Sequence, residues 1–182
     1  MNTNEKHERI LPNVEVGKTF TIGEFTFIRF PDVDGMTPVV MKDVAFRSRF
    51  GDNNDLRASV ALKRMQKEIL PKIIEAVGEE NVCTFKTDLT TLDGLKPYGD
   101  LESRISLYTL DFYRANVEIF DQYKVDCHVF LATPESAQPH DEPNWILCVS
   151  PSGVIGYYDY YVSCGVRPIL YFKSSIFGSF EE

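Results

Sequence analysis

The stretch Gly165-Val166-Arg167-Pro168-Ile169-Leu170-Tyr171-Phe172 decides the fold, because it places apolar residues on both sides of one arginine. This pattern predicts a strand that is buried on two faces and whose single charge is paired internally. The preceding run from Asn144 to Gly153 predicts another strand, over 145–150, and a turn. We therefore expect four structural residues in the closing part of a sheet: Trp145, Gly165, Arg167 and Pro168.

Further strands are predicted upstream of this stretch. Residues 17–30 alternate apolar and polar residues on either side of Gly23, which is typical of a hairpin with one buried face, and 37–41 predicts a third strand. Three more short strands are expected at 82–89, 104–108 and 128–132. The sequence therefore predicts a mixed or antiparallel sheet.

Two helices are predicted between these strands. In the longer helix, apolar residues recur at spacings of three and four from Leu62 to Val77, after a capping residue at Asn53, Asn54 or Asp55. Pro71 lacks a backbone donor, so we expect it to kink or divide this helix. A shorter helix over Asp111–Phe120 is expected to be capped by Thr109. Strands and helices that do not alternate regularly indicate the α+β class.

Length and composition indicate one folded domain. A chain of 182 residues with 43% apolar and 13% aromatic residues is not disordered. We assign 1–15 to a polar lead and 16–182 to a single domain. No run of 18 apolar residues and no apolar signal core is present, so we expect a cytoplasmic protein without membrane contact. The four cysteines and three histidines lack ligand spacing, which predicts reduced core cysteines, no metal and no cofactor.

The net charge of −8 is concentrated in the middle of the chain. Residues 88–142 hold eleven acids and four bases, and so carry −7 of that charge. Such a segment repels nucleic acid and attracts a basic protein surface. We therefore predict that the acids of this segment bind a protein partner, with no direct specific binding to nucleic acid. They are Asp88, Asp93, Asp100, Glu102, Asp111, Glu118, Asp121, Asp126, Glu135, Asp141 and Glu142.

No motif indicates catalysis. Neighbours on a strand point to opposite faces, so Cys127 and His128 are not expected to meet as nucleophile and base. The triplet Glu142-Pro143-Asn144 matches a calcium- and sugar-binding triplet of C-type lectins, but the Trp-Asn-Asp triplet of those lectins is absent. The run Tyr157–Tyr161 is either a stacking platform or an aromatic hairpin that covers the core. We expect a binding protein without catalytic residues.

Nearly the whole chain resembles a bacterial and phage domain of unknown function that is related to C-type-lectin-like folds. The resemblance covers 16–174 and rests on the hairpin, the long helix and the closing strands, together with three motifs: Thr-Asp-Leu-Thr-Thr-Leu-Asp-Gly at 87–94, Ser-Leu-Tyr-Thr-Leu-Asp-Phe-Tyr-Arg at 106–114 and Phe-Leu-Ala-Thr-Pro at 130–134. At 28–30 the chain has Ile-Arg-Phe where that family commonly has a tryptophan. The resemblance implies a compact C-type-lectin-like domain.

In length, acidity and domain type the chain also resembles the type II-A anti-CRISPR proteins, which inhibit Cas9. This resemblance implies a phage- or mobile-element-encoded protein of the bacterial cytoplasm that binds the Cas9–guide RNA complex and mimics DNA with its acidic surface. Three alternatives stay open. The domain is a lectin-like module that binds a sugar or a peptide, it is an enzyme, or it binds through the basic helix face formed by Arg57, Lys63, Arg64 and Lys67.

Overall fold

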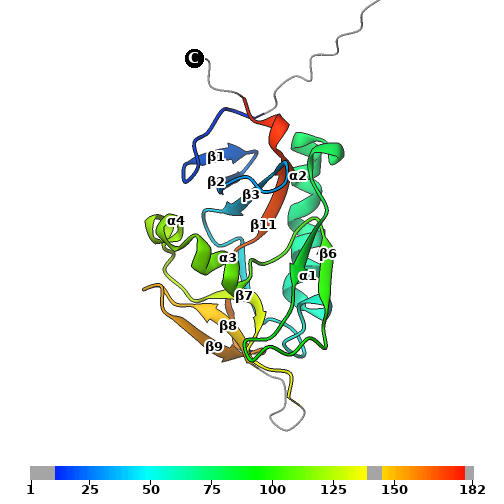
Figure 1. Cartoon of the computed structure of the whole chain (residues 1–182), viewed down its shortest axis with the longest axis vertical. Helices are drawn as coiled ribbons and strands as arrows, with labels where there is room; N and C mark the ends of the chain where they lie inside the picture. The colour runs from blue at the N-terminus through cyan, green and yellow to red at the C-terminus, as the bar shows by residue number, and fades with distance from the viewer. Residues whose placement is uncertain (1–10, 139–144, 179–182) are drawn as a thin grey trace, which may run out of the picture.

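The alternation of apolar and polar residues around Gly23 produces the predicted hairpin. Its two strands are the first two of a four-stranded antiparallel sheet in the computed structural model (Figure 1). The structure describes residues 11–138 and 145–178. Gly23 lies in the turn of this hairpin with a φ of 57°, a conformation that glycine adopts without steric cost. The strand order is β1-β2-β3-β11, and the strands are β1 (Thr19–Ile22), β2 (Phe25–Arg29), β3 (Met36–Met41) and β11 (Ile169–Lys173).

A second sheet of five strands has the order β4-β10-β7-β8-β9. Its β10–β7 pair is parallel and its other pairs are antiparallel, so the predicted mixed sheet is confirmed. The strands are β4 (Phe46–Ser48), β7 (Val129–Pro134), β8 (Trp145–Val149), β9 (Ile155–Asp159) and β10 (Cys164–Val166). A separate hairpin consists of β5 (Phe85–Asp88) and β6 (Asp100–Ser103).

The closing stretch 165–172 joins these two large sheets, and the prediction of one continuous strand was wrong. β10 ends at Val166 in the second sheet, and β11 begins at Ile169 in the first. Pro168 cannot donate to a ladder of hydrogen bonds, so a change of sheet at this point leaves no donor unpaired. The stretch is buried as predicted, and Arg167 lies at the junction between the sheets.

A continuous helical segment over 60–77 forms the predicted long helix. It comprises α1 (Val60–Arg64), a π-helical turn (Met65–Ile69) and α2 (Leu70–Val77). Pro71 follows the π-helical turn, so the helix accommodates the missing donor by local widening. Ser59 caps α1 by accepting a hydrogen bond from the Leu62 N–H, whereas the predicted cap Asp55 instead caps a 3₁₀ turn, Leu56–Ala58.

The predicted shorter helix is divided at Asn116 into α3 (Leu110–Ala115) and α4 (Val117–Phe120). Thr109 caps it as predicted, because its hydroxyl accepts from the Phe112 N–H at 3.1 Å. Short 3₁₀ turns complete the described chain at Glu79–Asn81, Asp121–Tyr123 and Ser174–Ile176. None of the described helices is both long enough and apolar enough to cross a membrane.

The central strands of both large sheets are buried on two faces. Successive residues of a strand belong to two different hydrophobic clusters. Phe27 and Phe130 belong to the first cluster, which includes the long helix, whereas Ile28 and Leu131 belong to the second cluster on the opposite side. The first cluster includes the predicted helix face, Leu62, Met65, Ile69, Ile73 and Val77, all of it buried. The second cluster lies with α3 and α4, and it is rich in aromatic side chains.

The packed chain begins earlier than the assigned boundary at residue 16. Leu11 is buried and forms a parallel bridge to Phe177, and Val14 is also part of the core. The part of the lead that the structure describes, 11–15, therefore belongs to the folded body. Leu11 and Phe177 also bring the two ends of the described chain together (Figure 1).

The cysteines are reduced in the structure, and Cys148 and Cys164 are buried. Burial raises the pKa of the Cys148 thiol to about 11 and that of Cys164 to about 12, from an ordinary value of 9.0. We expect both thiols to resist a thiol reagent at neutral pH until the protein unfolds, because the reactive species is the thiolate.

The same pKa shifts predict a loss of stability in alkali. A thiol whose pKa is higher in the folded protein stabilises the fold fully below pH 9 and less as the pH rises through 11 to 12. We expect the free energy of unfolding, measured by denaturant titration, to fall between pH 9 and 11. A double Cys148→Ala, Cys164→Ala variant should show a shallower fall, and an equal slope in the two proteins would refute this cause.

Candidate binding groove beside the β5–β6 hairpin

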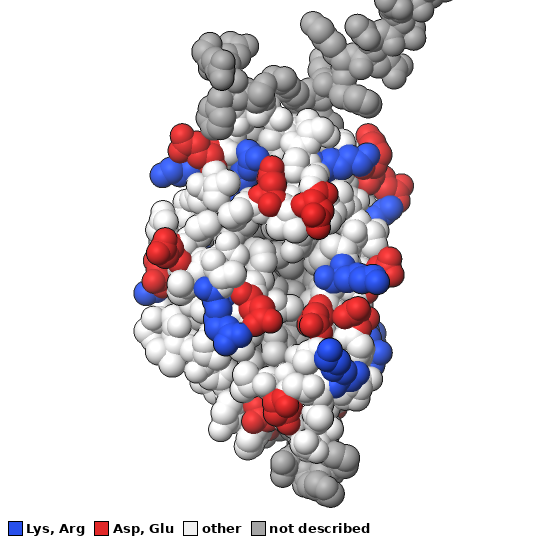
Figure 2. Space-filling view, in the orientation of Figure 1, with Lys and Arg blue, Asp and Glu red and all other residues white. Residues whose placement is uncertain are grey.

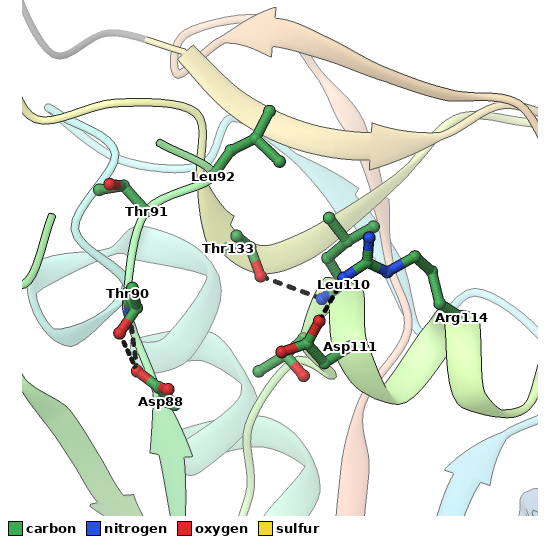
Figure 3. A pocket seen from close by; sticks show the side chains of 9 residues that line it. Asp88, Thr90, Thr91, Leu92, Leu110, Asp111, Arg114 and Thr133 are labelled. Carbon is green, nitrogen blue, oxygen red and sulfur yellow. Dashed lines mark hydrogen bonds and ion pairs between the residues drawn. The ribbon is translucent and has the colours of Figure 1, made fainter. Parts of the chain in front are cut away.

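Three sequence motifs that are far apart in the chain meet at one groove (Figure 3). The first comes from 87–94, the second from 106–114 and the third from 130–134. A pocket of about 210 Å³ lies between the end of β5, the start of α3 and Thr133. A neighbouring hollow of about 390 Å³ shares Asp88, Thr109 and Asp111 with it and extends toward the apolar side chains of β11.

Threonine hydroxyls fix the α3 side of the groove. The Thr133 hydroxyl oxygen accepts a hydrogen bond from the Leu110 N–H at 3.0 Å (Figure 3). The Thr109 hydroxyl accepts from the Phe112 N–H of the same helix. These two N–H groups at the start of α3 are therefore already paired, and this helix end is not free to hold an anion. Asp111 lies in the first turn of α3, where a negative charge is favourable, and pairs with Arg114 at 2.6 Å.

Asp88 is the carboxylate on the opposite wall. One of its oxygens accepts from the Thr90 N–H at 2.8 Å and from the Thr90 hydroxyl at 2.5 Å (Figure 3). The hydroxyl and then the N–H of Thr90 lower the pKa of Asp88 below its usual range. Asp88 therefore stays ionised at neutral pH and presents a negative charge to the groove.

A second carboxylate stands directly opposite Asp88 on the hairpin. The register of β5 and β6 pairs Asp88 with Asp100, two residues along the strand from the favourable pair Lys86 and Glu102. Like charges in directly opposite positions of an antiparallel pair are destabilising. Within 11–138 and 145–178, neither Asp88 nor Asp100 forms an ion pair, although Lys96 acts on Asp88 from a greater distance.

Asp93 belongs to the same end of the hairpin, in the loop that connects β5 and β6. It accepts hydrogen bonds from the hydroxyls of Thr91 and Ser136, the latter at 2.7 Å, and these bonds lower its pKa. Asp93 likewise has no ion pair within the described chain. Asp88, Asp93 and Asp100, which we call the hairpin carboxylates, are thus negative groups that form no ion pair within the described chain.

Of the other predicted acids, Asp111 lines the groove and Glu102 lies on β6 opposite Lys86, and several are neutralised by ion pairs. Asp111 pairs with Arg114, Asp121 with Lys124 at 3.4 Å and Asp126 with Arg47 at 3.5 Å. Figure 2 shows acidic and basic side chains interleaved on the face that it presents. Glu118 is exposed on α4, and Glu135 follows β7, while Asp141 and Glu142 lie outside the described residues, as does the triplet 142–144.

The basic helix face is also largely paired. Arg57 pairs with Asp55 at 2.7 Å, and Arg64 pairs with Glu68 at 3.0 Å and packs over the ring of Phe46. Lys63 and Lys67 are exposed. In the described part of the chain, no group of three or more His, Cys, Asp or Glu side chains is arranged to hold a metal ion.

Asn54 positions the loops around the groove, and sequence reasoning missed this role. Its side chain is fully buried, and its amide donates to the carbonyls of Ser136 and Trp145 at 2.8 and 3.0 Å. Its oxygen accepts from the Tyr98 hydroxyl at 2.7 Å. The sequence offers Asn54 only as a helix cap, and no local pattern indicates partners 44 to 91 residues away.

The four predicted structural residues have different surroundings. Arg167 and Pro168 are buried, and Gly165 leaves no room for a side chain, because a Cβ there would lie 2.9 Å from Cys127 Sγ and from Val44 Cγ2. Trp145 lies in β8, but its indole is 43% exposed and stacks on Tyr157 at 4.7 Å. In the tyrosine run, Tyr158 and Tyr160 pack on the core, as an aromatic hairpin that covers the core predicts, while Tyr157 and Tyr161 face solvent.

Comparison with known proteins adds no assignment: no protein family, curated protein or solved structure matches this chain. The functional argument therefore rests on the groove and its charges.

Proposed function

We propose that this protein is a non-enzymatic inhibitor that binds the Cas9–guide RNA complex through its acidic surface and blocks the engagement or cleavage of target DNA. The observation that carries the proposal is the cross-strand pair of Asp88, which lines the groove, and Asp100, which lies opposite it on β6. A like-charge pair costs stability in the free protein, and a cation supplied by a partner removes that cost.

The chemistry of the proposed partner fits such a surface. Cas9 holds its heteroduplex in a positively charged channel and reads the short motif beside its target with a pair of arginines. Arginine and lysine bind carboxylates by charge-assisted hydrogen bonds. The hairpin carboxylates therefore offer the partner a substitute for phosphate, and the apolar part of the groove beside β11 offers additional contact area.

The finer fold assignment is part of the same proposal. We propose a C-type-lectin-like domain, supported by the order of its elements: an opening hairpin, a long helical segment, the β5–β6 hairpin, and closing strands in which Trp145 precedes Gly165. A phage or mobile-element gene and a bacterial cytoplasmic location follow from the proposed target.

The direct experiment mixes the purified protein with Cas9 that carries guide RNA, and follows size-exclusion chromatography with a DNA cleavage assay. We expect co-elution and dose-dependent inhibition. Co-elution without inhibition, or inhibition without co-elution, would contradict the proposed mode of action. Free guide RNA and free target DNA serve as controls, and we expect neither to bind the inhibitor.

Asp100→Asn is expected to change the stability of the fold and the affinity for Cas9 in opposite directions. The substitution removes the like-charge contact with Asp88, so we expect the free energy of unfolding to rise by about 0.2 to 1 kcal/mol. The same substitution should weaken the complex with Cas9. A fall in stability, measured by denaturant titration, would show that the Asp88–Asp100 pair is not repulsive, and unchanged affinity would remove Asp100 from the interface.

One observation favours a second candidate function, that of a lectin-like module. Trp145 and Tyr157 form an exposed stacked pair, and the Trp145 indole N–H donates to Asp159 at 2.9 Å. Rigid exposed aromatic rings are suitable platforms for sugars. Binding on a glycan array that is lost in a Trp145→Ala variant, without co-elution with Cas9, would select this function over the first.

A further inference from the structure

Exposed apolar side chains concentrate on the hairpin formed by β8 and β9. Nine large hydrophobic residues are exposed among the described residues, and five of them belong to this hairpin or its flanks: Trp145, Val154, Ile155, Tyr157 and Tyr161. The other four are dispersed along the chain between Val16 and Val117. Exposed hydrophobic residues that occur singly need no explanation, but a group of this size marks an interaction site.

β9 is also the outermost strand of the second sheet (Figure 1). The Ser150 N–H donates to the Val154 carbonyl, which sets the alternation of hydrogen bonds between β8 and β9. Gly156 and Tyr158 therefore direct their backbone groups toward β8. Ile155 and Tyr157 direct theirs outward and form an open edge, together with the N–H of Asp159, whose carbonyl accepts from the Val162 N–H at 3.0 Å.

This edge lacks the usual protection against pairing with another chain. Natural edge strands are shielded by lysine, proline, bulges or shortness. β9 has five residues, contains no lysine, arginine or proline, and pairs with β8 without a register shift. The opposite edge of the same sheet, β4, has only three residues and carries Arg47.

We propose that β9 pairs with β9 of a second copy of this chain, in antiparallel orientation, and so joins two five-stranded sheets into one. The twofold axis passes beside Tyr157, which lies opposite Tyr157 of the second copy. Ile155 then faces Asp159, whose outward N–H donates to the Ile155 carbonyl of the second copy. This inference concerns a surface separate from the groove and does not depend on the proposed function.

The charges of the strand are compatible with this pairing. Asp159 is the only ionisable acid of β9, and it faces isoleucine across the axis, so the register brings no carboxylates into direct opposition. Its two carboxylate oxygens accept from Trp145 Nε1 and the Tyr161 hydroxyl, which hold it on its own hairpin. The aromatic rings of Trp145 and Tyr157 then supply the apolar contact around the axis.

The test measures the mass of the full chain in solution by light scattering coupled to size-exclusion chromatography. We expect wild type to have twice the mass of one chain. Tyr157→Lys places a charge on the edge and should weaken dimerisation by at least about tenfold, whereas Val33→Lys, at a similarly exposed valine outside the hairpin, should not. A monomeric wild type, or a Tyr157→Lys variant as dimeric as wild type, would overturn the proposal.

Disulfide trapping tests the register and does not depend on how Tyr157→Lys folds. In Tyr157→Cys the twofold axis places the two new cysteines in directly opposite positions, about 5.5 Å apart at Cα, a separation that a disulfide spans. In Ile155→Cys the equivalent residues are displaced by four positions along the strand, or about 13 Å. We expect rapid oxidation to a covalent dimer in the first variant and slow oxidation in the second, and equal rates would contradict the register.

Discussion

Replacing Arg167 by alanine is expected to lower the free energy of unfolding by about 3 kcal/mol or more, because the buried side chain joins the end of β3 to the turn after α4. Its Nε donates to the Met41 carbonyl at 2.7 Å, and one Nη donates to the carbonyls of Lys42 and Tyr123 at 2.8 and 3.0 Å. Met41 ends β3, and Tyr123 ends the 3₁₀ turn that follows α4. The alanine variant leaves three carbonyls without this donor and opens a cavity.

The positive charge of Arg167 is held by carbonyl dipoles. Within the described chain it forms no ion pair, and only 3% of the residue is exposed. The carbonyl of Tyr123 lies at a helix end, where a cation is favourable. Denaturant titration measures the effect, and Arg47→Ala, at an exposed arginine, is the matched control. An unchanged midpoint for Arg167→Ala would show that the junction between the sheets does not depend on this side chain.

Replacing Asn54 by alanine is expected to cost about 2 kcal/mol or more, because three hydrogen bonds of a buried amide are lost together. The carbonyls of Ser136 and Trp145 lose a donor, and the Tyr98 hydroxyl loses its acceptor. The neighbouring Asn53 is the control. It is exposed and accepts only from the Asp55 N–H, so Asn53→Ala should cost less.

Tryptophan fluorescence gives this prediction a local measurement. The chain has one tryptophan, and the carbonyl of that residue is an acceptor of the Asn54 amide. Loss of the amide should loosen the start of β8 and change the emission of Trp145 at denaturant concentrations below the main transition. Coincident fluorescence and circular dichroism transitions in Asn54→Ala would contradict a local role for this side chain.

Patterns of period two and period 3.6 predicted most elements of the fold, because burial of one face depends only on spacing along the chain. The opening hairpin, the helix face from Leu62 to Val77 and the Thr109 cap follow from such spacing. The exchange between sheets at Arg167 could not be predicted in this way. An apolar run with one arginine has the same pattern whether it continues in one sheet or crosses to another.

The groove depends on contacts that no local pattern encodes. Its acids were predicted from charge density, but the opposition of Asp88 and Asp100 depends on the register of a hairpin with an eleven-residue connection. Likewise, the sequence does not reveal that Asp111, Asp121 and Asp126 are paired with bases while the hairpin carboxylates are not. Charge density identifies candidate residues, and tertiary structure determines which of them retain an uncompensated charge.

The difference between paired and unpaired acids provides the most direct test of the proposed function. The measurement is the affinity for the Cas9–guide RNA complex of two variants that each lose three carboxylates, at about 0.05 and 0.2 M salt. The first, Asp88→Asn, Asp93→Asn, Asp100→Asn, removes the hairpin carboxylates. The second, Asp52→Asn, Asp121→Asn, Asp126→Asn, removes the same formal charge from ion-paired positions outside the groove.

If the hairpin carboxylates bind the partner, the first variant should bind much more weakly than the second and lose most of the salt dependence of wild type, since fewer charge contacts remain to be screened. Equal losses in the two variants would show that only net charge matters. Wild-type affinity in the first variant would contradict the account that the hairpin carboxylates inhibit Cas9.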